Sequence, residues 1–270
     1  MFDLFAISEW TLVTVLAVVL VFATEIGYRH GRKRSDRHSS DGTKSFQAHE
    51  VSALGVLALL LGFTFSLAGN RFETRREMIV NEANAIGTAA LRGNLLPEPL
   101  AAQSQALFAR YVDMRVCLFE AGIETEAQAA ALKASEEMRQ QMWRIAAEAL
   151  TSNRLDVGAG LFADAVNTVI DLHGARKAAS SYHLPDAIFL LLISVAILAF
   201  ALSGIAAGYS HARSRMPTLI LVVLVCAVAL FIIDLDRPQR GLLMVNDQSM
   251  RELADMIKMP QPDKPTPAPE

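Results

Sequence analysis

Four long apolar blocks limit what this chain can fold into. They lie at about residues 10–28, 51–69, 187–209 and 217–233. Each block is close to the roughly 20 apolar residues that a helix needs to cross the hydrocarbon core of a bilayer. A soluble protein of 270 residues has little interior in which to bury four such helices. The sequence therefore predicts a multi-pass membrane protein.

Composition excludes several other classes of protein. Hydrophobic residues make up 52% and charged residues 20% of the chain, whereas about 25% of an average soluble domain is charged. The net charge of −3 excludes a strongly basic nucleic-acid binder. Two cysteines do not make a disulfide framework, and the six histidines show no metal-ligand spacing. Phosphate-loop, zinc-protease and hydrolase motifs are absent, so we expect no enzymatic activity, no metal and no cofactor.

The spans predict the organisation of the chain. Residues 1–69 form a first transmembrane hairpin with a basic loop at 29–50, and residues 185–234 form a second hairpin. Residues 70–184 have helical periodicity and no strand-like alternation. The predicted fold is an all-α integral membrane protein, with four transmembrane helices in two hairpins and an extramembrane antiparallel helical bundle inserted between spans two and three.

Within the bundle, the second span is expected to continue as one helix to about Gly93. Residues 94–99, with two prolines, end this helix, and a second one is predicted up to Gly122, with an apolar stripe made of Leu107, Tyr111, Met114 and Leu118. Further helices are predicted over 125–151 and 156–182. The C-terminal segment, 235–270, should contain a short amphipathic helix at 248–258, followed by a disordered proline-rich tail.

The charges of the short loops predict an orientation in the cytoplasmic (inner) membrane. Residues 29–50 carry six Lys or Arg residues, the loop before the last span carries Arg213 and Arg215, and the first nine residues carry none. The positive-inside rule places these two loops in the cytoplasm. Both termini and the helical bundle would then lie outside.

The second span holds the candidate pore-lining residues. Gly55, Leu59 and Phe63 recur every four residues, and Arg71 follows at the exit of the span. A ring of Phe63 side chains from several subunits would form an apolar constriction of the kind that gates by dewetting. Alternatively, Leu59 and Phe63 face lipid or neighbouring helices. In the third span, Gly204 and Gly208 form a small-xxx-small pair that lets helices approach closely.

Two segments resemble the signature of a known family. VNEANAIGTAALRGNLLPEP (residues 80–99) and DLDRPQRGLLMV (residues 234–245) are similar to segments of the bestrophin-like domain proteins, uncharacterised bacterial membrane proteins. The residues that carry the resemblance are Asn81, Glu82, Asn84, Arg92, Asp236, Arg237, Pro238, Arg240 and Gly241. The spacing of the four spans agrees with this resemblance, which covers nearly the whole chain.

A more distant resemblance is to the bestrophins, which are pentameric anion channels. LLGFTFSLAGNRFE (residues 60–73) is similar to their pore region, which implies that Gly55, Leu59 and Phe63 occupy the neck positions. The resemblance also implies a cytoplasmic helical region, opposite to the orientation that the loop charges predict. The first functional hypothesis is therefore a homo-oligomeric channel for inorganic anions in the lipid bilayer.

The second hypothesis is a membrane sensor or scaffold that transports nothing and whose helical bundle binds a partner. In that case the polar residues after the second span would form hydrogen bonds between helices. They are Asn81, Glu82, Asn84, Thr88 and Arg92.

Overall fold

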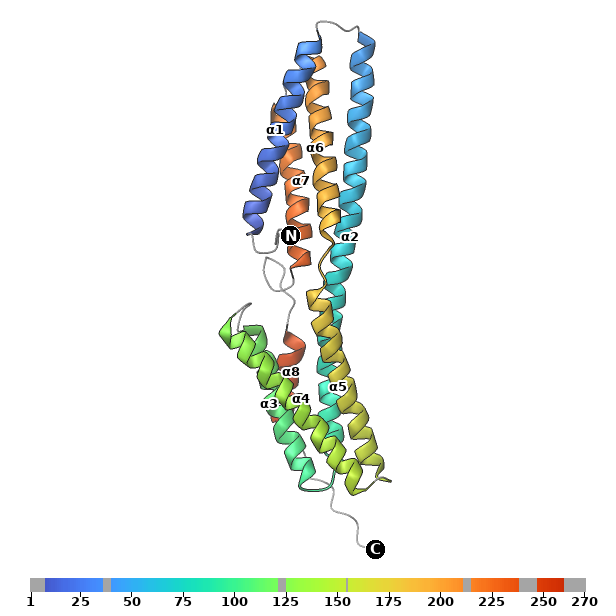
Figure 1. The fold of residues 1–270 in the computed structure, drawn as a ribbon, viewed down its shortest axis with the longest axis vertical. Helices are drawn as coiled ribbons and strands as arrows, with labels where there is room; N and C mark the ends of the chain where they lie inside the picture. Colours follow the sequence, from blue (N-terminus) through green and yellow to red (C-terminus); the bar gives the residue numbers. More distant parts are fainter. Residues whose placement is uncertain are drawn as a thin grey trace. The chain divides into compact units, whose positions relative to one another are not determined.

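The computed structural model describes residues 8–35, 40–120, 125–153, 155–210, 215–237 and 247–259. These residues form eight α-helices, and none of them forms a strand (Figure 1). The prediction of an all-α chain is confirmed.

Within the part of the chain that the structure describes, four helices are long and apolar enough to cross a membrane, as predicted. They are α1 (Glu9–Ser35), α2 (Ser40–Gly93), α6 (Asp186–Tyr209) and α7 (Arg215–Asp236). Helix α2 is continuous over 54 residues and ends at Gly93, as expected. It begins at Ser40, so the predicted loop at residues 29–50 is shorter than expected. A helix can continue into polar residues beyond the apolar segment that crosses the membrane.

The chain divides into two compact units. Unit 1 comprises Met1–Glu73 and Tyr182–Met244, and unit 2 comprises Thr74–Ser181 and Val245–Glu270. In unit 1, helix α1 packs along α6 and also contacts α7. One apolar cluster draws on all four spans, with Leu20 from α1, Leu57 and Leu61 from α2, Phe200 from α6 and Ile232 from α7.

Unit 2 combines the C-terminal part of α2 with α3 (Leu100–Glu120), α4 (Glu126–Ser152), α5 (Val157–Ser181) and α8 (Gln248–Lys258). Side chains fix two of the helix starts, as expected for these residue types. The hydroxyl of Thr125 accepts the Gln128 N–H at 3.0 Å, and the carboxylate of Asp156 accepts the Gly158 N–H at 2.7 Å.

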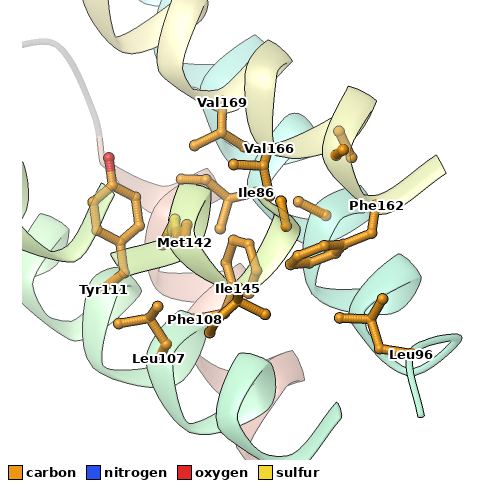
Figure 2. Close-up of a cluster of buried hydrophobic side chains, with 14 of the residues drawn as sticks. Ile86, Leu96, Leu107, Phe108, Tyr111, Met142, Ile145, Phe162, Val166 and Val169 are labelled. Atoms are coloured by element: carbon orange, nitrogen blue, oxygen red, sulfur yellow. The ribbon is translucent and has the colours of Figure 1, made fainter. Parts of the chain in front are cut away.

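The core of unit 2 is mainly aliphatic and includes the aromatic side chains of Phe108, Tyr111 and Phe162. Figure 2 shows Ile86, Phe108, Met142 and Phe162 gathered between the helices. The rings of Phe108 and Phe162 meet edge to face, with centroids 6.3 Å apart. Helix α8 buries Met250 in the same core, so this amphipathic helix packs its apolar face against protein.

Candidate functional site

One face of α2 in unit 1 is uncovered. Leu59 is 57% and Phe63 60% exposed, and a Cβ built on Gly55 would meet nothing within 4 Å. The stripe that includes Leu57 and Leu61 is buried in the four-span cluster instead. The three predicted pore-lining positions therefore share an open apolar face, which in an assembled or membrane-embedded molecule can contact lipid, another subunit or a pore.

Arg71 lies further along α2 and is half-buried. Its Nη1 atom is buried and meets no hydrogen-bond acceptor among the described residues. A buried donor without an acceptor costs about 1–3 kcal/mol, and more when it is charged. Nη1 of Arg71 is therefore an unsatisfied buried donor among the described residues.

The end of α7 carries a buried polar group. Asp234, Asp236 and Arg237 are 1%, 0% and 7% exposed. Both carboxylate oxygens of Asp236 accept the Leu184 N–H at 3.1 Å, and Nδ1 of His183 lies 3.7 Å from the same carboxylate. Asp236 thus ties the segment before α6 to the end of α7.

The other residues of the signature segment at 234–245 form fewer contacts among the described residues. Arg237 lies 3.7 Å from the Glu9 carboxylate. The predicted site residues Pro238, Arg240 and Gly241 lie outside the described residues.

Glycines make the contact between α1 and α6 unusually close. A Cβ on Gly204 or Gly208 of α6 would lie within 3.0 Å of the α1 backbone. The same holds for Gly27 and Gly31 of α1 against the α6 backbone. Our sequence analysis did not include the α1 pair, although its four-residue spacing is the same signal of close helix packing.

A buried charge cluster lies in unit 2 around Glu82, which is fully buried. Arg115 of α3 donates to its carboxylate at 2.8 Å, and Arg176 of α5 also donates to it. His173 Nδ1 lies 3.5 Å away. Burial and the neighbouring Arg115 lower the pKa of Arg176, whose guanidinium also lies 4.8 Å from the ring centroid of Phe119. One carboxylate therefore holds together three helices.

The other signature residues of α2 differ in their surroundings. Arg92 donates to the Asp164 carboxylate at 3.0 Å and to the Leu161 carbonyl at 2.9 Å, both on α5. Asn81 and Asn84 are exposed.

Sequence analysis missed the cationic partners of Glu82. A signal for Arg115 was present, because Arg115 falls on the apolar stripe of α3 between Tyr111 and Leu118. A charge at such a position indicates a buried ion pair. The stripe itself was predicted with Met114, which is only half-buried, in place of Arg115.

The described residues offer no metal site, since no three His, Cys, Asp or Glu side chains among them converge. The geometry instead provides an open apolar face on α2, a half-buried arginine beyond it and a buried ion cluster in unit 2. These features suit helix association and electrostatic attraction.

Comparisons with known proteins agree with this membrane-type architecture. Residues 13–250 match the model of the Bestrophin-like domain family. Among solved structures, a variant of a bacterial bestrophin homologue from Klebsiella pneumoniae has a TM-score of 0.65 and 16% identity, covering 92% of this chain and 99% of that chain. A second variant has a TM-score of 0.66 and 15% identity, covering 93% and 100%.

A further structure of the Klebsiella homologue has a TM-score of 0.62 and 16% identity, covering 91% of this chain and 94% of that chain. At these identities the likeness shows a shared fold. Among curated proteins, none matches the chain.

Proposed function

The chain belongs to the Bestrophin-like domain family, and from this premise we propose that it forms a homo-oligomeric membrane channel for inorganic anions. One α2 helix from each subunit lines the pore. The observation that carries the proposal is the open face of α2, where Gly55, Leu59 and Phe63 have no covering helix in the single chain.

The composition of this face supports a protein neighbour rather than lipid alone. The exposed residues of all four spans include large apolar side chains, such as Phe22, Phe63 and Leu224, which suit lipid tails. The open part of α2 contains Gly55 and Gly62, and a Cβ on either would meet nothing within 4 Å. Small residues of this kind let a second helix approach closely.

Phe63 and Arg71 would have different roles in such a pore. A ring of Phe63 side chains forms an apolar constriction that controls conduction through wetting. Arg71 raises the local concentration of anions at the exit of the span, since a cation at the mouth of a low-dielectric channel focuses the field.

The proposal includes a membrane arrangement. The four spans cross the cytoplasmic membrane as two hairpins, with the helical segment between the second and third spans outside the bilayer as an antiparallel bundle. The loop charges favour an external bundle, and the resemblance to bestrophins favours a cytoplasmic one. We propose the orientation that the charges favour.

Anion flux in liposomes tests the pore assignment. We expect the purified chain to conduct chloride, and we expect Phe63→Ala to increase the flux because it widens and wets the constriction. Phe22→Ala is the matched control, since Phe22 is 64% and Phe63 60% exposed on different spans. Unchanged flux and selectivity in Phe63→Ala would remove Phe63 from the pore, and an unaltered chain that conducts nothing would contradict the channel.

A sensor or scaffold remains the second candidate, and the Glu82 cluster favours it. The Glu82 carboxylate and the Arg92 guanidinium form ion pairs that join helices within unit 2. Conduction through a pore would not require these ion pairs. If the protein conducts no ion and co-purifies with one specific partner that binds unit 2, the scaffold would replace the channel as the function.

A further inference from the structure

A groove of about 750 Å³ lies between α4 and α5 in unit 2. Its lining comes from residues spaced three or four apart, which share one face of each helix. The residues that matter for its chemistry are Arg139, Trp143 and Arg144 from α4, and His173, Gly174 and Lys177 from α5.

The groove is positively charged. Arg139, Arg144 and Lys177 line it together with one carboxylate, Glu136, which forms an ion pair with Arg139. Arg144 and Lys177 form no ion pair with any residue that the structure describes, and both are exposed. Two cationic side chains are therefore available to a ligand.

The floor of the groove is held in place. Arg139 and His173 are each 8% exposed. His173 Nδ1 lies 3.5 Å from the Glu82 carboxylate, within the buried cluster described above. Side chains that are nine-tenths buried have little freedom to lose when a ligand binds, which lowers the entropic cost of binding.

An aromatic side chain completes the lining. Trp143 is 47% exposed, and an aromatic ring of this size in a basic groove provides a surface for stacking. On the opposite helix, Gly174 leaves room, because a Cβ there would meet nothing within 4 Å.

We propose that this groove binds a small organic anion that carries a flat aromatic ring. Its carboxylate or phosphate group pairs with Arg144 and Lys177, since a guanidinium donates two parallel hydrogen bonds to such oxygens. Its ring lies against Trp143, in the space beside Gly174. This site is independent of conduction, so its test and the flux test can fail separately.

The sequence allows a direct assay with the full chain in detergent. The chain has two tryptophans, Trp10 and Trp143, so Trp10→Phe leaves Trp143 as the single fluorescent reporter. The probes are benzoate and phenyl phosphate, with cyclohexanecarboxylate and inorganic phosphate as ring-free controls. We expect saturable changes in Trp143 emission with both aromatic anions, and at least tenfold weaker binding of the ring-free anions. Calorimetric titration of the unaltered chain with benzoate provides the same comparison without a substitution.

One matched pair of variants and one double variant locate the site. Gly174→Leu should fill the groove and weaken benzoate binding at least tenfold. Gly160→Leu is the matched control, since Gly160 lies on the same helix, also has nothing within 4 Å of a Cβ, and does not line the groove. The double variant Arg144→Gln, Lys177→Gln should also weaken binding at least tenfold.

Three results would overturn the proposal. The first is the absence of saturable binding of either aromatic anion, by fluorescence and by calorimetry. The second is equal binding by the Gly174→Leu and Gly160→Leu variants, which would place the ligand elsewhere. The third is binding of inorganic phosphate or cyclohexanecarboxylate as tight as that of the aromatic anions, which would leave no role for Trp143.

Discussion

Replacing Glu82 by Gln should strongly destabilise unit 2. The Glu82 and Arg115 side chains are 0% and 3% exposed and lie 2.8 Å apart, so the substitution leaves a buried guanidinium without a counter-charge. Breaking a buried pair from one side typically costs about 3–5 kcal/mol. For a unit of this size, that loss corresponds to a fall in Tm of about 10–20 °C. Thermal unfolding of the full chain in detergent, followed by Trp143 emission in a Trp10→Phe background, measures the change.

Two further variants test the reasoning behind this value. Adding Arg115→Gln to Glu82→Gln should recover part of the stability, because it removes one of the two guanidinium charges that Glu82 balances, the other being that of Arg176. The two substitutions are then non-additive. Asp164→Asn breaks an ion pair with Arg92 in which the Asp164 side chain is 73% exposed, and such pairs contribute about 0–1 kcal/mol. A fall in Tm for Glu82→Gln no larger than that for Asp164→Asn would refute the electrostatic role of the cluster.

Three other predictions concern pH, helix packing and orientation. Burial raises the pKa of Tyr111 above its ordinary value of 10.0. The neutral phenol therefore contributes stability that is fully present below pH 10 and is lost as the pH rises through the raised pKa; Tyr111→Phe should lose less stability above pH 10 in alkaline unfolding measurements, and parallel curves would contradict this. Gly204→Ala should lower the Tm in detergent, because its Cβ overlaps the α1 backbone and overpacking costs about 1–3 kcal/mol; Gly62→Ala, whose Cβ meets nothing within 4 Å, is the control, and equal Tm values would argue against the close contact. With Cys117 replaced by Ser and a cysteine at Leu155, which is 90% exposed, an impermeant maleimide should label intact cells if the loop charges set the orientation; labelling only after permeabilisation would place unit 2 in the cytoplasm.

The membrane character of the chain could be predicted from composition because it depends on local sequence alone. A run of about 20 apolar residues is sufficient evidence for a span wherever it packs. The number of spans and the long continuation of α2 to Gly93 follow from such local signals. The start of α2 at Ser40 does not, since residues 40–50 are polar and hydropathy does not report on their helicity.

The partners of the candidate residues could not be predicted in the same way. Glu82 and Arg176 are 94 positions apart in the chain, and Gly204 meets the carbonyl of Thr24 on another span. Periodicity shows which face of a helix is buried, but the neighbour of that face depends on how all the helices pack together. The exposed fraction of a side chain does not identify a pore residue either. Phe63 and Phe22 are similarly exposed, and only the glycines of α2 distinguish their surroundings.

The charges inside unit 2 explain why one carboxylate is so important there. Three of its arginines, Arg75, Arg115 and Arg139, are at most 8% exposed, whereas Glu82 is the one carboxylate buried to that degree among the described residues of the unit. A buried cation is stable only if it is paired or well hydrogen-bonded. Arg115 has Glu82 as its partner, but Arg139 at the floor of the groove pairs with Glu136, whose side chain is 57% exposed and screened by solvent. At the groove, the charge of Arg139 is therefore offset by a carboxylate that solvent screens, so an anionic ligand bound there would gain from this charge.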